Sequence, residues 1–296
     1  MVGTCTKAVM GLIVALAFAS GAGAAASPDV SAMNLQASDV PGAKIVTQRA
    51  VNEQGYLAAN FRSFVFSAPS GSARLVAIRA ETALAASSPR AVADVAATEK
   101  PFRSPAGRKA LIAAVAQAVN IKVKAIVLGQ PHKVAGYDQG FEVAISIGIK
   151  GGRIYENLVV VRLDRVLVQM SEFAGRPITA GVTAKYMTAI AGHIGTQLAP
   201  IAASPPTVTG TAQQDQTLTA TAGAWTAGDA TFGYQWQRCD AAGANCADVA
   251  GATAETYAVT AEDVGMTLRV VVTATNRFGS APGTSVQTGV VTAIVT

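Results

Sequence analysis

The stretch FGYQWQRCDAAGANC, residues 232–246, decides how the last third of the chain folds. Its aromatic residues Phe232, Tyr234 and Trp236 recur with a period of two. A β-strand therefore places all three rings on one face of a sheet, with small or polar side chains on the other. The pattern predicts a half-buried strand that brings a large apolar surface to a core.

Two cysteines, Cys239 and Cys246, follow this strand and flank the run AAGAN. The small, turn-forming residues between them let the chain double back, so the two sulfur atoms can come within bonding distance. Closing a loop this short adds about 2–3 kcal/mol to stability in the chain-entropy account. Two free, buried thiols are the alternative.

The first 26 residues have the pattern of a secretory signal peptide. A short start containing Lys7 precedes an apolar run at 8–19, and small residues at 22–26 offer cleavage sites. An uncleaved anchor is the alternative, although the run is shorter than the roughly 20 residues of a full membrane span. Cleavage leaves two cysteines, an even number that suits one disulfide in an oxidising compartment. We expect an extracellular or cell-surface protein with no transmembrane span after signal cleavage.

Length and one proline-bearing run divide the rest of the chain. Its 296 residues exceed the usual size of one domain, so two are expected. The run APIAASPP, residues 199–206, has the composition of a hinge. We predict a signal peptide at 1–26, a domain at 27–200, a linker at 201–206 and a second domain at 207–296.

Charge is distributed unevenly between these two predicted domains. Nineteen basic and eleven acidic side chains between residues 28 and 200 give +8, whereas three basic and seven acidic ones after 200 give −4. A basic exported domain favours an anionic partner, such as a cell-wall polymer or lipid head groups. The alternative is that the charge only keeps the domain in solution. No nucleic-acid partner is expected, because the aromatic residues that stack on bases are missing from the basic region.

The middle of the chain alternates between strand and helix patterns. Period-two runs predict strands, and the Ser-Pro pairs at 88–89 and 104–105 predict the starts of two helices. Strands followed by helices, strands and a helix indicate an α+β domain, an antiparallel sheet with packed helices. A turn around Pro41-Gly42, within residues 35–46, leads into a first predicted strand. The other predicted strands are 56–67, 74–85, 121–128, 141–149, 153–162 and 165–173, and the helices begin near 89, 105 and 181.

The sequence of the last domain predicts short strands at regular spacing, a pattern typical of an all-β sandwich. The strands are expected at 207–210, 216–222, 231–239, 255–260, 267–276 and 285–295. The side chains expected to point inward are Leu218, Ala220, Tyr234, Trp236, Leu268, Val270 and Val272.

Two resemblances follow from motifs in these regions. PPTVTG, DQTLTATAGAW, YQWQRCD, GATAETYAVTAEDVG and LRVVVTATNRFGS closely resemble the Ig-like repeat of secreted and surface proteins of actinobacteria, over residues 205–293. That resemblance implies an Ig-like sandwich with Cys239 bonded to Cys246, used as a spacer or adhesive module. SDVPGAK and VVVRLDRVLV resemble exported PsbP/Mog1-like or sensor-type α+β domains, which implies a partner-binding or apolar-ligand role and transfers no site residue.

Signatures of catalysis are absent from the sequence. It contains no phosphate-binding glycine loop, no G-x-S-x-G, no H-E-x-x-H and no C-x-x-C, so no cofactor, metal or catalytic residue is assigned. His132 lies in a polar loop near Asp138 and Glu142 and is the best candidate base, although a solvated loop histidine is the simpler interpretation. His193 is expected to be a packed or half-exposed residue of the last helix.

A basic group lies at the start of the second helix. Arg103, Arg108 and Lys109 fall near a helix N-terminus, whose N–H groups favour anions, so they form a candidate anion site. A solvated basic face is the alternative.

These observations favour a non-enzymatic envelope protein. The α+β domain would recognise an anionic or apolar ligand, which could be a cell-wall polymer, a lipid or another surface protein. A secreted hydrolase with a targeting module is the second interpretation, and a purely structural wall component is the third. The oligomeric state does not follow from the sequence.

Overall fold

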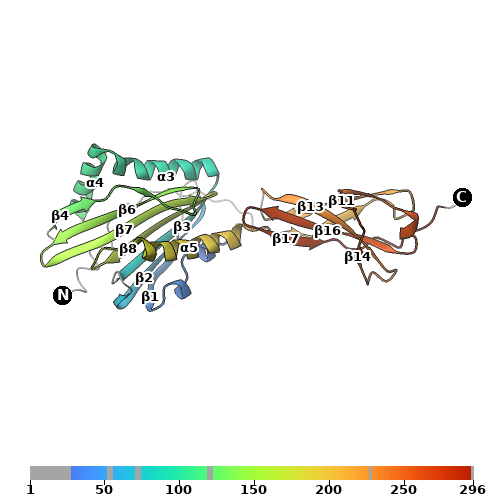
Figure 1. Ribbon diagram of the computed structural model, residues 1–296, viewed down its shortest axis with the longest axis horizontal. Helices are drawn as coiled ribbons and strands as arrows, with labels where there is room; N and C mark the ends of the chain where they lie inside the picture. Colours follow the sequence, from blue (N-terminus) through green and yellow to red (C-terminus); the bar gives the residue numbers. More distant parts are fainter. Residues whose placement is uncertain (1–27, 52–55, 71–74, 119–122, 227–228, 295–296) are drawn as a thin grey trace. The chain divides into compact units, whose positions relative to one another are not determined.

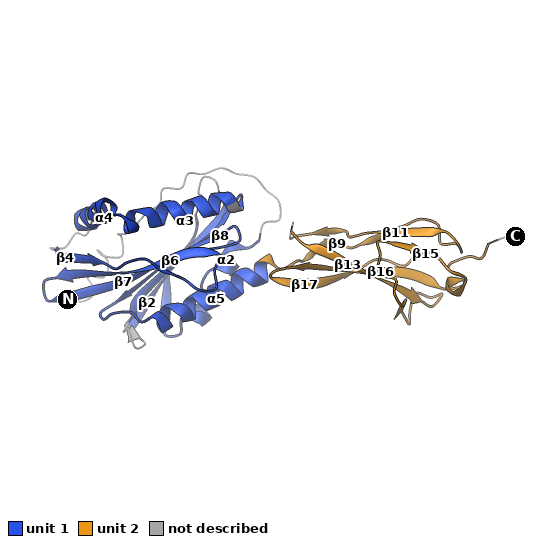
Figure 2. Ribbon diagram, turned by 45° about the horizontal axis from the view of Figure 1, so that its top comes forward, with its two compact units in different colours: residues 1–197 blue, residues 198–296 orange. Residues whose placement is uncertain are grey.

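The computed structural model describes residues 28–51, 56–70, 75–118, 123–226 and 229–294 (Figure 1). The predicted signal peptide at 1–26 lies outside the described residues. The chain forms two compact units, Met1–Gln197 and Leu198–Thr296 (Figure 2). Each unit has a core of its own and is considered by itself below.

The first unit is built on one eight-stranded antiparallel sheet. Its strands follow the order β1-β2-β3-β8-β7-β6-β4, with β5 paired to β6, so β7 and β8 lie near the middle. The strands are β1 (Ala43–Val51), β2 (Tyr56–Ser70), β3 (Leu75–Ala85), β4 (Val123–Leu128), β5 (His132–Lys133), β6 (Gln139–Ile149), β7 (Gly152–Leu163) and β8 (Val166–Ala174).

Helices cover both faces of this sheet. On one face, α3 (Ser88–Arg103) packs over β6, β7 and β8, and α4 (Pro105–Ala118) packs over β4 (Figure 1). On the other face lie α2 (Val30–Met33), η1 (Ala37–Asp39) and α5 (Ala180–Leu198). The core on the α3 side contains Val95, Phe102, Val115, Phe141, Val143, Leu158, Val160 and Phe173.

The junction between α3 and α4 follows from local sequence. Pro89 lies in the first turn of α3, and the hydroxyl of Ser104 accepts a hydrogen bond from the N–H of Gly107 at 3.0 Å, as an N-cap does. A Cβ at Gly107 would lie 2.5 Å from the backbone oxygen of Pro101, so only glycine allows this close approach. The predicted helix starts at the two Ser-Pro pairs are confirmed.

The second unit consists of short strands in three sheets. One sheet has the order β14-β13-β16-β17, another β10-β11-β15, and the third pairs β12 with β9. Trp236 is fully buried, stacks on Tyr257 with ring centroids 5.4 Å apart, and donates to the oxygen of Ala254. The strands are β9 (Ala202–Ser204), β10 (Thr207–Thr209), β11 (Thr217–Thr221), β12 (Ala224–Trp225), β13 (Thr231–Cys239), β14 (Ala247–Asp248), β15 (Thr256–Ala258), β16 (Thr267–Asn276) and β17 (Gly279–Thr284).

The inward side chains predicted for this unit are confirmed with one difference in degree. Leu218, Trp236 and Val270 are fully buried, whereas Tyr234 is half-buried and Phe232 is 41% exposed. The aromatic face of β13 thus passes from solvent into the core along the strand.

Asp263 anchors the loop before β16 in the second unit. Its buried carboxylate accepts hydrogen bonds from Arg238, from the Tyr257 hydroxyl and from both the backbone and side chain of Thr260. Burial acts to raise the pKa of Asp263, but these hydrogen bonds outweigh it and the pKa is lowered. The carboxylate is therefore buried in its charged form, because hydrogen bonds from neighbouring residues replace those it would make to water.

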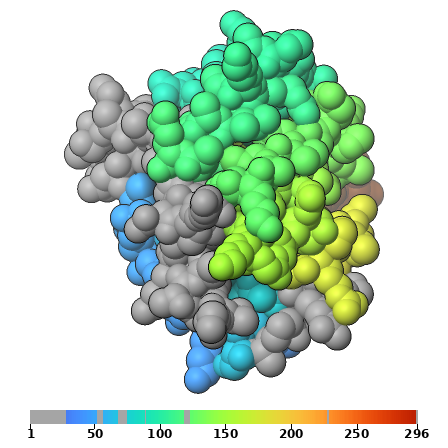
Figure 3. Space-filling view, turned by 90° about the vertical axis from the view of Figure 1, so that its left-hand side faces the viewer, coloured from blue at the N-terminus to red at the C-terminus, as the bar shows by residue number. Residues whose placement is uncertain are grey.

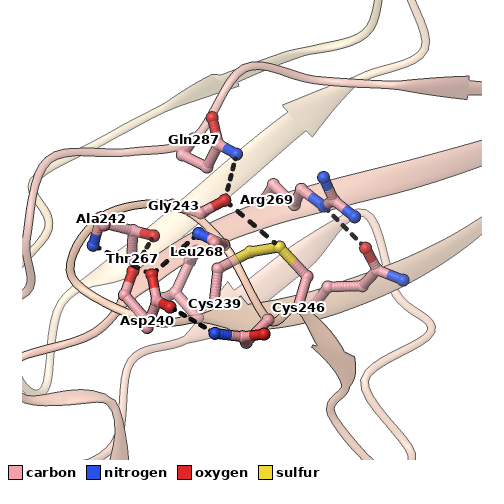
Figure 4. The surroundings of a disulfide bond; sticks show 12 residues. Cys239, Asp240, Ala242, Gly243, Cys246, Thr267, Leu268, Arg269 and Gln287 are labelled. Atoms are coloured by element: carbon pink, nitrogen blue, oxygen red, sulfur yellow. Dashed lines mark hydrogen bonds between the residues drawn. A yellow bond between two sulfur atoms is a disulfide. The ribbon is translucent and has the colours of Figure 1, made fainter.

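The predicted disulfide between Cys239 and Cys246 is present (Figure 4). The loop it closes is also held by Asp240, whose carboxylate accepts hydrogen bonds from the backbone of Ala242 and Ala244 and from Asn245. The loop conformation therefore has two independent supports, one covalent and one polar.

The expected fold class, an α+β domain followed by an Ig-like sandwich, is wrong. Of the described residues, 47% lie in strands and 23% in helices, so the protein is mostly β. Strand β2 runs on to Ser70, past the predicted strand end at residue 67, because cross-strand pairing outweighs the turn preference of the residues that follow. The strands of the second unit divide into three small sheets in place of the two of a sandwich. Along the described chain, no helix is long and apolar enough to cross a membrane.

Replacing both cysteines tests the covalent support of the second unit. We expect C239S/C246S to keep its fold and to lose about 2 kcal/mol of unfolding free energy, because the unfolded chain regains the entropy of a short loop. Tryptophan fluorescence in urea reports this unit selectively, since Trp225 and Trp236 both belong to it. An unchanged midpoint would show that hydrogen bonds such as those of Asp240 and Gln287 hold the loop without the disulfide.

Candidate functional site

An open apolar groove lies between the end of α3 and the start of α4. In Figure 3, α4 (green) lies at the surface of the end of the first unit that faces the viewer. Lys100 supplies the charged group of the lining, and the remainder is almost entirely apolar. The lining residues are Lys100, Pro101, Ser104, Gly107, Ala110, Leu111 and Ala114.

The basic residues predicted as an anion site have separate roles around this groove. Arg103 forms an ion pair with Glu99 one turn back on α3. Lys109 is exposed, but it lies about 200° around the axis of α4 from Gly107, on the side away from the groove. Arg103 and Lys109 therefore do not converge on one anion.

Arg108 serves the packing of α4. Its guanidinium donates to the backbone oxygens of Phe102, Leu128 and Gly129, at 3.3 Å for Phe102 and 2.7 Å for Gly129. These bonds tie α4 to the end of α3 and to β4, because they satisfy carbonyl groups that the helix end and the strand end leave open. Arg108 is thus structural, Arg103 is paired with Glu99, and Lys109 is exposed to solvent.

The groups considered for catalysis are also engaged. His132 and Glu142 are cross-strand neighbours on β5 and β6, but the Glu142 carboxylate accepts a hydrogen bond from Asn157 at 2.9 Å. Asp138 accepts from Arg162 and from the backbone N–H of Asp164. Within the described ranges, no group of three His, Cys, Asp or Glu side chains could hold a metal ion.

His193 is half-exposed on α5, as expected, and has a specific partner. Its Nε2 lies 2.9 Å from Oδ2 of Asp39. The pair joins α5 to η1, so His193 contributes to the packing of the N-terminal segment.

Two glutamates that the sequence gave no reason to single out are buried in the middle of the sheet. Glu156 on β7 is 3% exposed and Glu172 on β8 is fully buried. Their side chains point to opposite faces, because Glu172 pairs with Asn157, the residue after Glu156. Each face of the sheet therefore carries one of these two buried carboxyl groups.

Glu156 lies on the face that α3 and α4 cover. Burial raises its pKa to about 7, against the opposing effects of a hydrogen bond with Ser171 and the charge of Arg79. Its Oε1 has no hydrogen-bond partner, and neither has Nε of Arg79, whose guanidinium lies 5.8 Å from the centre of the Phe173 ring. A carboxyl group in this position is more stable protonated.

Glu172 lies beneath α5. Burial raises its pKa to about 7, and the charge of Glu142 adds to the effect, while hydrogen bonds from Thr183 and Asn157 oppose it. The Thr183 hydroxyl donates to Oε2 of Glu172 at 2.6 Å, so this carboxyl group connects the sheet to the first turns of the helix.

Comparison with known proteins adds little to this description. No protein-family model and no curated protein matches the chain. Among solved structures, the extracellular domain of PknH from Mycobacterium tuberculosis is similar at 13% identity with a TM-score of 0.35, covering 59% of this chain and 96% of that one. A likeness at this level identifies neither a fold nor a function.

The two buried glutamates predict how stability depends on pH. Folding raises both pKa values from 4.5 to about 7, so the folded state binds more protons than the unfolded state between these limits. The unfolding free energy of the first unit is therefore expected to fall as pH rises from 4.5 to 7, then level off. E156Q removes one ionisable group, so it should stabilise the unit at pH above 7, on the order of 2 kcal/mol, with little effect near pH 4.5.

Circular dichroism at the helix band checks this, because all described α-helices begin in the first unit. The control is E262Q, a change at an exposed glutamate of the second unit. Equal stability of E156Q and the unmodified protein across this pH range would contradict the account.

Proposed function

We propose that this chain is an exported, non-enzymatic binding protein whose first unit binds an anionic amphiphile of the cell envelope in the α3–α4 groove. The observation that carries the proposal is the lining of that groove, an apolar floor with one lysine at its side. The second unit then serves as a spacer or an adhesive module.

The chemistry of the groove favours one class of ligand. Pro101, Ala110, Leu111 and Ala114 offer apolar surface on which an acyl chain can be buried, at roughly 25 cal/mol per Å². Lys100 offers one ammonium group to a carboxylate or phosphate at the head of that chain. The net charge of +8 between residues 28 and 200 attracts anionic ligands at longer range.

Two features support export. Residues 1–26 have the composition of a secretory signal. The bonded pair Cys239 and Cys246 is the kind of cross-link that persists in oxidising compartments.

We assign no reaction to this protein because the carboxylates near His132 already bond other residues of the sheet. The two carboxylates that could orient His132 are engaged, Glu142 by Asn157 and Asp138 by Arg162. A general base needs a carboxylate or similar group to fix its ring, and here those groups support the sheet.

Substitution of the groove lysine tests the ligand class. K100E should weaken binding of the fluorescent fatty acid cis-parinaric acid about tenfold, because it exchanges attraction for repulsion at the head group. Binding of the uncharged methyl ester should change little. The matched control is K109E, since Lys109 lies on the opposite side of α4. Equal losses in K100E and K109E would mean that only overall charge matters.

A bulky substitution tests the apolar floor independently. A114W fills the groove and should abolish binding of both the acid and its ester, whereas A113W, at an exposed neighbouring position, should leave both unchanged. Fluorescence titration measures both variants. Binding of either probe to A114W with unchanged affinity would rule out the groove as the site.

A further inference from the structure

Four polar side chains from three strands and a helix meet on the α5 face of the sheet. The carboxamide Nδ2 of Asn157 on β7 lies 2.9 Å from Glu142 Oε1 on β6, 3.4 Å from Glu172 Oε2 on β8 and 2.7 Å from Thr183 Oγ1 on α5. Thr183 in turn donates to Glu172. Two carboxyl groups are thereby held by one amide.

The charges of this cluster do not balance. An amide has two N–H groups, which cannot serve three acceptors equally. Glu172 is fully buried, and one of its oxygens, Oε1, has no partner. The charge of the part-buried Glu142 disfavours ionisation of Glu172, so a proton on Glu172 relieves the repulsion.

The groups around Glu172 are mostly uncharged or acidic, and the base beside the cluster is His132, the cross-strand neighbour of Glu142. Its β3 neighbour is Ile78, and β6 contributes Glu142. From α5 it is approached by Tyr186, whose own pKa is raised by burial and by Glu172. The ammonium of Lys185 lies over the Tyr186 ring, 5.6 Å from its centre.

We propose that Glu172 holds a proton beside the Glu142 carboxyl group, and that this proton keeps the first turns of α5 closed over the sheet. When the proton is lost, Glu172 is a buried carboxylate beside a second carboxylate. Thr183 and Tyr186 of α5 lie next to this carboxylate, so water reaches it when this end of α5 moves away from the sheet. Ionisation therefore favours opening of this end of the helix, while acid holds it shut.

The raised pKa of Glu172 places this response just below neutrality. By linkage, opening becomes more favourable as pH rises from the ordinary value of 4.5 towards about 7, because the open state loses its proton first. This device does not depend on the ligand proposed above.

Hydrogen exchange on the full chain tests the proposal. We expect the protection factors of amides in the first two turns of α5, after correction for intrinsic exchange, to fall at least tenfold between about pH 5 and about pH 7.5. Amides of β7 should change less, which separates local opening from unfolding of the unit. E172Q, which cannot ionise, should keep α5 protection constant over the same range.

The matched control is E156Q, which removes the other buried glutamate, on the opposite face of the sheet, and should retain the full α5 response. If E172Q fails to fold, E142Q serves in its place. Without the second charge the pKa of Glu172 is raised less, so the loss of α5 protection should be smaller and should level off at a lower pH. Constant protection in the unmodified protein, or a response in E172Q equal to that in E156Q, would overturn the proposal.

Discussion

The first unit depends on the burial of β7 and β8 on both faces. Residues 158–161 of β7 are completely buried although successive side chains point to opposite sides of the sheet. An antiparallel sheet can leave one face to water, but this pair cannot, because both of its faces are apolar. Helix α3 covers one face of this pair and α5 covers the other, so the order of the layers follows from the apolar side chains of two strands.

Because both faces of β7 and β8 are buried, the polar side chains of these strands need hydrogen-bond partners within the unit. A polar side chain in a one-sided sheet can point to solvent, whereas Glu156, Asn157 and Glu172 must find partners inside the unit. The second unit shows the opposite outcome at Asp263, where four hydrogen bonds hold a buried carboxylate in its charged form. Glu156 and Glu172 have fewer donors, so burial prevails and the protonated form is favoured.

Local patterns predicted local structure well. The Ser-Pro pairs marked the starts of α3 and α4, the period-two aromatics of β13 placed Trp236 in a core, and the cysteine spacing fitted a bonded loop. The fold class was wrong because periodicity identifies a strand's faces but not how many strands share a sheet or whether both faces are covered.

Periodicity was equally insufficient to predict the candidate sites of the first unit. The apolar runs ENLVVV and VLVQMSEF give no sign that their charged residues, Glu156 and Glu172, are buried. The sequence also could not show that Arg108 bonds backbone carbonyl groups, because only the tertiary structure brings these groups near it. The α3–α4 groove depends on Gly107 and Pro101 meeting across two helices, which no single segment encodes.

Titration of the glutamate side chains by carbon-detected NMR tests the central claim most directly. If both faces of the β7–β8 pair are closed to water, the carboxyl carbons of Glu156 and Glu172 should titrate with midpoints about 7, well above the ordinary value of 4.5. Midpoints near 4.5 for both residues would contradict it, because each carboxyl group would then be in contact with water.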